Sequence, residues 1–166
     1  MLSEGEDVAR IIRAAFTPYF RALGREYPAD RTDAYAARWK QLVAELDRGD
    51  VYVALEGDGE GDGDRAHIVG AVRTKVQEDD LYIQQIAVDP AQQGSGVGSW
   101  LLARIDEVAR ARGLGSLSLE TAGMAVANIR LYRRHGFEIV RRGPPDHGLD
   151  PHPRVYMVKT FRVAAS

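Results

Sequence analysis

Three glycines lie close together in the stretch DPAQQGSGVGSWLL, which covers residues 89–102. Gly94, Gly96 and Gly98 stand between a predicted strand and a predicted helix. The N-terminus of a helix offers about four unpaired N–H groups and a partial positive charge, so it attracts anions. Glycine lets such N–H groups approach a phosphate and permits left-handed turns that a side chain would hinder. This spacing therefore predicts a phosphate-binding loop, with a tight turn that binds nothing as the alternative.

Two common phosphate-binding loops do not fit these residues. A Walker loop requires Gly-Lys-Ser/Thr, whereas Ser99 and Trp100 follow Gly98. A dinucleotide-binding loop requires G-x-G-x-x-G, and Ser99 occupies the place of the third glycine when the count begins at Gly94. A phosphate-binding function of this loop would therefore require a different type of loop.

Hydrophobic periodicity predicts the elements that carry this loop. A capping box at Ser3 and Glu6 precedes an apolar stripe at helical spacing, which predicts a first helix. The helix after the glycines should end at Gly113 and bury one stripe, made of Trp100, Leu101, Ile105, Val108 and Ala109. Further helices are expected over 31–49 and 125–135, and strands over 51–56, 67–77, 81–89, 116–121, 137–142 and 154–161, with a polar connection at 78–80. This order predicts an α/β sheet of mixed direction in a single domain of residues 1–166.

Composition excludes several classes of function. The chain has 166 residues, a net charge of -2 and no cysteine, so disulfides and thiolate chemistry are ruled out. A small negative charge does not favour nucleic acid as a partner. No apolar run approaches the ~18 residues of a membrane span, and the start lacks a secretory signal. We therefore expect a cytoplasmic protein without membrane or nucleic-acid partners.

Two segments invite a metal interpretation, and neither supports it well. Residues 57–65 alternate acids as a calcium loop does, but the twelfth position, which should be a bidentate Glu, is Val69. A hairpin loop is the preferred interpretation. His147, Asp150 and His152 are too few for a firm site, so no metal is expected.

Two motifs in order carry a family resemblance. Gln93-x-x-Gly96-x-Gly98 follows a predicted strand, and residues 128–137 read NIRLYRRHGF. Together they resemble the GNAT superfamily of acyl-CoA-dependent N-acetyltransferases. The resemblance implies an α+β fold with a mixed, mostly antiparallel sheet of six to seven strands and about four helices. It also implies a splayed strand pair that forms a slot for acetyl-CoA.

The resemblance implies that acetyl-CoA is the co-substrate and assigns the residues that bind it. N–H groups of the glycine loop would hold the diphosphate, Gln93 would fix the turn, and the preceding strand would bind the pantetheine arm as an added strand does. Asn128 is the candidate to replace the family's pantetheine-binding asparagine, whose position here is Ala125; a plain position at the helix surface is the alternative. The implied coenzyme-binding residues are Ile86, Ala87, Val88, Gln93, Gly94, Ser95, Gly96, Val97, Gly98, Ser99 and Asn128.

The catalytic residues implied by the resemblance are Tyr132 and Glu120. Tyr132 stands at the family's acid position, four residues before Gly136, and would protonate or hydrogen-bond the CoA thiolate. The strand that often supplies a general base carries Gln84 and Gln85 instead, so Glu120 is the first candidate for the base and Glu78 the second. A solvated strand-end carboxylate is the alternative for Glu120. The family's usual first strand, before the first helix, is not evident.

These residues predict transfer of an acetyl group from acetyl-CoA to a primary amine of a small molecule or a protein. The resemblance is also compatible with a homodimer. One alternative is a catalytically weak or inactive acyl-CoA-binding regulatory module, because the family's Glu and Asn are displaced. Another is a nucleotide-triphosphate enzyme. The sequence does not specify the acceptor.

Overall fold

The computed structural model of the chain describes residues 3–22, 51–56, 67–145 and 152–161. The helix expected over 31–49 and the acidic loop at 57–65 lie outside these residues, as do His147 and Asp150. The described helices are α1 (Ser3–Ala22), α3 (Val97–Ala111) and α4 (Val126–Arg134), together with a short 3-10 turn, η2 (Pro90–Gln92). The strands are β1 (Val51–Glu56), β2 (His67–Gln77), β3 (Asp80–Val88), β4 (Ser116–Ala122), β5 (Glu138–Gly143) and β6 (Arg154–Thr160).

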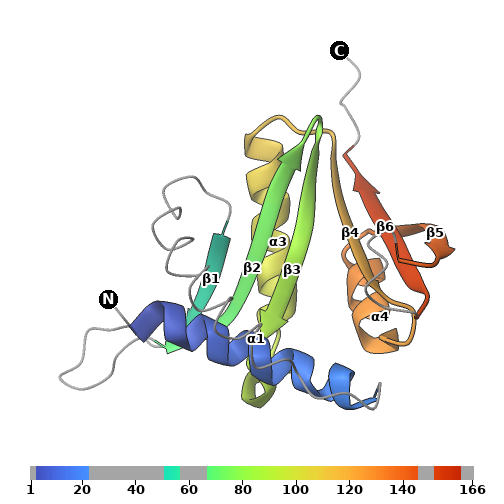
Figure 1. The fold of residues 1–166 in the computed structure, drawn as a ribbon. Coiled ribbons are helices and arrows are strands. Elements are labelled where there is room, and N and C mark those ends of the chain that lie inside the picture. The colour runs from blue at the N-terminus through green and yellow to red at the C-terminus, as the bar shows by residue number, and fades with distance from the viewer. Residues whose placement is uncertain (1–2, 23–50, 57–66, 146–151, 162–166) are drawn as a thin grey trace. The chain divides into compact units, whose positions relative to one another are not determined.

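The strands form one six-stranded sheet in the order β1-β2-β3-β4-β6-β5. β1 and β2 pair antiparallel, as do β4 with β6 and β5 with β6, whereas β3 and β4 pair parallel. The predicted sheet of mixed and mostly antiparallel direction is therefore confirmed. In the described part of the chain the first helix precedes every strand (Figure 1).

Element boundaries follow the prediction closely, with one difference between β2 and β3. The connection expected at 78–80 is only two residues long, since Asp80 already belongs to β3 and aligns with Ser116 of β4. Glu78 adopts a φ of 53°, which suits a tight turn. Asp80 also accepts hydrogen bonds from the hydroxyls of Ser116 and Ser118, and these bonds hold it in the strand.

The chain divides into two compact units, and each is described by itself. Unit 1 comprises residues 1–73 and 85–101. There α1 packs its apolar stripe against β1, β2 and the end of β3 (Figure 1). The buried residues of this cluster are Val8, Ile11, Ile12, Val51, Ile68, Ala71 and Ala87. The spacing of Val8, Ile11 and Ile12 places them on one face of α1. Ile68 and Ala71 are three residues apart in β2, on either side of the register shift in its pairing with β1.

Unit 2 comprises residues 74–84 and 102–166. Its strands β4 and β6 alternate buried and less buried residues, with Leu117, Leu119, Val155 and Met157 on the buried face. The second half of α3 buries Leu102, Ile105 and Ala109. Removing these side chains from water is the main stabilising term for the unit.

The buried stripe of α3 differs from the prediction at one residue, Trp100. Trp100 is 55% exposed, whereas its neighbours Leu101 and Leu102 are buried. The stripe begins one residue later than expected and runs through Leu101, Leu102, Ile105 and Ala109. Trp100 is apolar, which favoured its assignment to the stripe, but it lies on the exposed face of α3.

Candidate functional site

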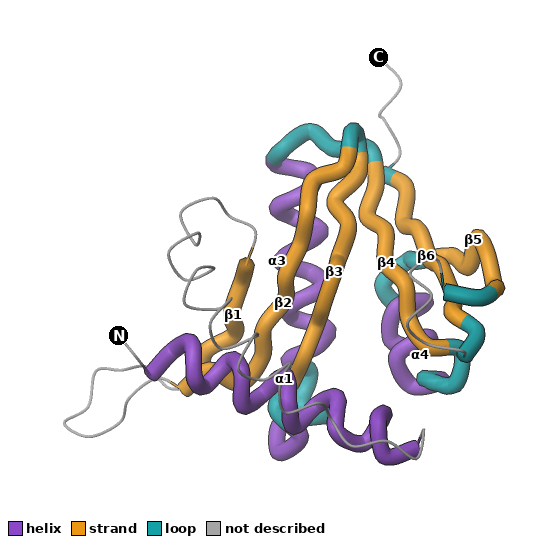
Figure 2. The backbone as a smooth tube through the Cα atoms, in the orientation of Figure 1, coloured by secondary structure: helices purple, strands orange, loops and turns teal. Residues whose placement is uncertain are grey.

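A short connection leads from the end of β3 into α3 (Figure 2). Asp89 follows the strand, and its side chain accepts a 3.0 Å hydrogen bond from the N–H of Ala91. This is the action of an N-cap residue. Pro90 then begins η2, where its missing N–H costs nothing. The Asp-Pro pair therefore ends the strand and turns the chain toward the glycines.

The backbone of the glycine loop has the conformation that the sequence predicted. Gly94 has a φ of 84° and Gly96 a φ of 99°, a left-handed region that L side chains rarely adopt. A Cβ placed on either glycine would find no heavy atom within 4 Å in the described structure. Glycine is therefore needed here for backbone conformation rather than for tight packing. The space beside both residues is open to a ligand.

The N–H groups of this loop are left available at the start of α3. The first helical hydrogen bond of α3 runs from the N–H of Trp100 to the carbonyl of Gly96, at 2.9 Å. No backbone carbonyl of the described residues pairs with the N–H groups of Gly94, Gly96, Val97, Gly98 or Ser99. Gly94 and Gly96 are exposed, and residues 97–99 are half-buried. This arrangement matches a site for an anionic group.

Side chains inside the loop hold its shape. The hydroxyl of Ser95 donates to the carbonyl of Gln92 at 2.6 Å, and the Ser95 N–H donates to the same oxygen at 3.2 Å. Gln93, expected to fix the turn, donates from Nε2 to the carbonyl of Val88 at 3.4 Å. That bond is long, so Gln93 contributes less than the Ser95–Gln92 pair.

The start of α3 packs closely on β2 because Gly70 has no side chain. A Cβ at Gly70 would lie 2.9 Å from both Leu101 Cδ1 and Val97 Cγ1, and 3.3 Å from the Ala87 carbonyl. Contacts this short would require the side chains of Leu101 and Val97, or the helix that carries them, to shift. Gly70 thus lets the first turn of α3, and with it the loop, take its place in unit 1. Its sequence context gave no sign of this role.

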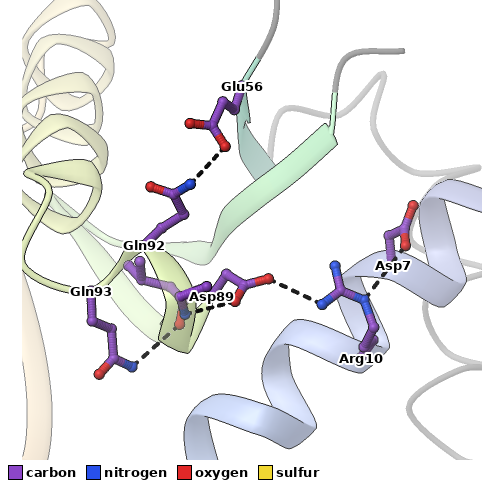
Figure 3. Close-up of polar contacts among 8 residues, drawn as sticks. Asp7, Arg10, Glu56, Asp89, Gln92 and Gln93 are labelled. Carbon is purple, nitrogen blue, oxygen red and sulfur yellow. Dashed lines mark hydrogen bonds and ion pairs between the residues drawn. The ribbon is translucent and has the colours of Figure 1, made fainter. Parts of the chain in front are cut away.

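Residues outside the loop also fix it, and the sequence did not identify them. Arg10 of α1 donates from Nη1 to Asp89 Oδ2 at 3.0 Å, and Gln92 Nε2 donates to Glu56 Oε2 of β1 at 2.7 Å (Figure 3). The Asp-Pro dipeptide was the only available signal, as a turn-forming pair. The partners Arg10 and Glu56 are distant in sequence, so no local pattern could have indicated them.

The predicted acid, Tyr132, is buried in unit 2. It lies on α4 with 5% of its surface exposed, and its ring meets that of Phe137 edge-on at a centroid distance of 6.0 Å. Loss of water contact raises the pKa of Tyr132 to about 12. Burial favours the uncharged phenol, so the hydroxyl stays protonated and able to donate throughout the physiological range.

The predicted base, Glu120, is engaged by a cation. It lies near the end of β4, and Arg154 Nη2 of β6 approaches its Oε1 to 3.3 Å. Both side chains are largely covered, with exposed fractions of 15% for Glu120 and 17% for Arg154. The contact with Arg154 therefore holds the Glu120 carboxylate in place near the end of β4.

The remaining predicted residues are spread over both units. Ile86 and Val88 are half-buried in β3, and Ala87 between them belongs to the unit 1 core. Asn128 is exposed on α4, one turn before Tyr132. Unit 1 thus contains the residues of the glycine loop, whereas Tyr132, Glu120 and Asn128 all belong to unit 2.

Neither a metal site nor a membrane span is found in the described residues. No group of three or more histidine, aspartate or glutamate side chains gathers there as a ligand set. Of the three residues His147, Asp150 and His152, only His152 lies within the described part of the chain. Among the described helices, none combines the length and the apolar character needed to cross a bilayer.

Comparison with known proteins identifies the family. The acetyltransferase (GNAT) family matches residues 10–137, which is more than half of the chain. The chain belongs to the GNAT acetyltransferase family. The glycine loop and Tyr132 both lie within the matched residues.

Two relatives by sequence are named as acetyltransferases. An IAA acetyltransferase of Azospirillum brasilense is 41% identical over 70 residues, which is 42% of this chain and 44% of that protein. A streptothricin acetyltransferase of Streptomyces lavendulae is 38% identical over 76 residues, 46% of this chain and 40% of that protein. The chain thus spans less than half the length of these relatives.

Solved structures share the fold of this GNAT chain. PaiA N-acetyltransferase of Thermoplasma acidophilum, solved with coenzyme A, has a TM-score of 0.70 at 13% identity and covers 96% of this chain and 94% of its own. The ribosomal-protein-S18-alanine N-acetyltransferase of Escherichia coli has a TM-score of 0.63 at 19% identity. The match covers 100% of this chain and 93% of that protein. At such identities the likeness establishes the fold alone.

Proposed function

We propose that the chain is an N-acetyltransferase that moves an acetyl group from acetyl-CoA to a primary amine. The observation that carries this proposal is the loop with left-handed Gly94 and Gly96, open space beside both, and N–H groups available at the start of α3. Membership of the GNAT family supports it. The proposal treats residues 1–166 as one domain that works in the cytoplasm.

In the proposed complex, the N–H groups of residues 94–99 bind the coenzyme's diphosphate. A fixed set of N–H donors at a helix N-terminus stabilises such charge without needing to reorganise on binding. The parallel pairing of β3 with β4 covers Asp80–Ile83 and Ser116–Leu119. We assign the later β3 residues Ile86, Ala87 and Val88 to the pantetheine arm, with Asn128 as a further polar contact.

Acetyl transfer then needs no covalent enzyme intermediate. The amine nitrogen forms a bond to the thioester carbon, and the carbon–sulfur bond breaks to release the CoA thiolate. With a pKa of about 12, Tyr132 would give its proton to a thiolate whose thiol has a pKa near ~8.5 only against roughly 5 kcal/mol. We therefore assign Tyr132 to a hydrogen bond that stabilises the leaving sulfur, and solvent to the final protonation.

The amine must lose a proton before or during its attack, and Glu120 is the proposed acceptor of that proton. A carboxylate is one of the groups that act as general bases, and the contact with Arg154 holds that of Glu120 in place near the end of β4. The acceptor would be a small-molecule amine or a protein amine. The two relatives named above act, by their names, on different molecules.

One observation favours a second candidate function, a regulatory module that binds acyl-CoA with little turnover. Gln84 and Gln85 stand where a base is common in the family, and Arg154 engages Glu120. Under that function the glycine loop would bind the coenzyme while the catalytic residues remained ineffective. The two candidates differ in turnover and not in coenzyme binding.

Calorimetry with coenzyme A, followed by an acceptor screen, tests both candidates. We expect heat of binding with coenzyme A, and release of free thiol from acetyl-CoA when a suitable amine is added. Binding without thiol release across small amines, amino acids and peptide N-termini would favour the module. An absence of binding would contradict both. Binding of ATP that coenzyme A does not displace would instead indicate a nucleotide-triphosphate enzyme.

A further inference from the structure

We propose that Asp89 is a positioning residue for the coenzyme loop, residues 94–99. Through its bonds to α1 and β2, Asp89 holds this loop in the conformation that binds the ligand before any ligand is present. This inference deepens the proposed function and rests on it for the identity of the ligand. Its structural part, that Asp89 orders the loop, stands on contacts within unit 1.

Asp89 joins three elements through separate atoms, and Figure 3 shows the bonds of its side chain. Its N–H donates to the carbonyl of Val69 in β2 at 2.8 Å. Its Oδ1 accepts from the N–H of Ala91 in η2, and its Oδ2 accepts from Arg10 in α1, both at 3.0 Å. Each bond restrains the backbone against a different neighbour at the point where the chain leaves β3. Asp89 therefore fixes both the position and the direction of η2.

The order imposed by Asp89 passes to the glycines through Gln92. Gln92 is the last residue of η2, and its side chain is tied to Glu56 of β1 at 2.7 Å. Its carbonyl accepts both bonds from Ser95. The Gln92 N–H donates to the carbonyl of Asp89 at 2.8 Å. Because Ser95 lies between the two left-handed glycines, a continuous set of hydrogen bonds runs from Asp89 to the proposed binding groups.

The charge of Asp89 would oppose an anionic ligand if nothing balanced it. Arg10 supplies the balancing charge across the 3.0 Å contact, and Arg10 in turn lies 3.7 Å from Asp7. The hydrogen bond from Ala91 lowers the pKa of the Asp89 carboxyl; burial opposes this, and Arg10 adds to the lowering. The carboxylate is therefore ionised at neutral pH and keeps both bonds. Ordering the loop in advance removes an entropic cost from ligand binding.

Asp106 provides a matched control in unit 2. Like Asp89, it is a largely covered carboxylate paired with an exposed arginine, since Arg110 Nε lies 2.8 Å from Asp106 Oδ2. The two side chains are equally exposed, at 18%. Burial would raise the pKa of Asp106, but its bonds with Arg110 and Lys159 outweigh burial and lower it. Asp106 has no contact with the loop among the described interactions, so its loss should affect stability alone.

The experiment compares Asp89→Ala, Asp89→Asn, Arg10→Gln and Asp106→Asn in the full chain. Amide hydrogen exchange without ligand reports loop order, and calorimetry reports the Kd for coenzyme A. In Asp89→Ala we expect faster exchange at Gln92–Ser95 and a Kd raised about 10-fold, as the loss of a cap and an ion pair implies. Asp89→Asn and Arg10→Gln keep the cap bond, so each should raise the Kd only about 2–3-fold, with no further loss when combined.

Asp106→Asn should lower the melting temperature and leave both loop exchange and the Kd unchanged. Unchanged exchange at Gln92–Ser95 in Asp89→Ala would overturn the inference, as would an equal change in Asp106→Asn. Faster exchange with an unchanged Kd would overturn the link to binding. If the unmodified protein gives no heat with coenzyme A, the proposed function fails, while the exchange data still decide whether Asp89 orders the loop.

Discussion

The glycine loop of unit 1 and the surroundings of Tyr132 in unit 2 offer a ligand different parts of the chain. Residues 94–99 present backbone N–H groups, and two left-handed glycines determine where those groups point. In unit 2 the candidate groups are side chains, namely the hydroxyl of the buried residue Tyr132 and the carboxylate of Glu120 held by Arg154. Binding through the backbone depends on conformation, whereas chemistry through side chains depends on burial and neighbouring charge.

This difference shows in how each region should respond to substitution. A change in the loop should alter affinity for the coenzyme and leave the chemical step alone. A change at Glu120 or Tyr132 should alter the chemical step and leave affinity nearly unchanged. Four experiments test that separation.

Glu120→Gln should give the largest effect. If Glu120 takes the proton of the amine, kcat should fall by about 100-fold or more, since general bases contribute at least that much. Arg154→Gln is the control because it breaks the same ion pair and keeps the carboxylate. Steady-state rates with saturating acetyl-CoA measure both. Equal losses in the two variants would assign Glu120 a structural role.

Tyr132→Phe should lower kcat by roughly 10- to 150-fold, the worth of about 1.5–3 kcal/mol for a hydrogen bond to a charged group. The Kd for coenzyme A should stay the same, since the loop of unit 1 is untouched. Phe keeps the ring that packs against Phe137, so the melting temperature serves as a control and should hardly change. An unaltered rate would remove Tyr132 from the mechanism.

Gly96→Ala should raise the Kd for coenzyme A by roughly 5- to 30-fold. An L residue at a φ of 99° is strained by about 1–2 kcal/mol. The free loop of the variant relieves this strain by adopting another conformation, so coenzyme binding must supply the energy that restores the left-handed one. Gly113→Ala is the matched control, because Gly113 has a φ of 71° and equally open space at the end of α3. It should lower stability without changing the Kd. A similar Kd in both variants would show that the loop conformation does not matter.

A spectroscopic titration should give the smallest effect. Because burial raises the pKa of Tyr132 to about 12, ultraviolet difference spectra between the unmodified protein and Tyr132→Phe should show no extra tyrosinate near pH 10. Tyr132 therefore contributes stability that is complete below the unfolded pKa of ~10 and is lost as the pH rises toward about 12. Tyrosinate from Tyr132 near pH 10 would contradict its burial.

Local patterns predicted the elements well because they depend on neighbouring residues. The strand predicted over 67–77 is β2 in full, and the strand over 51–56 is β1. The helix after the glycines and the one before Gly136 also formed where periodicity placed them. Trp100 was misplaced because hydrophobicity does not reveal the rotation of a helix by one residue.

The sequence alone determined the order of elements, the glycine loop and the family to which its motifs belong. It did so because helix and strand periods, and the need for glycine at positive φ, are properties of short segments. Only the tertiary structure showed that Arg10 and Glu56 hold the loop, that Gly70 admits α3, that Arg154 engages Glu120 and that burial raises the pKa of Tyr132. These contacts join residues far apart in the chain, and their strength depends on the solvent and charge that folding leaves around them.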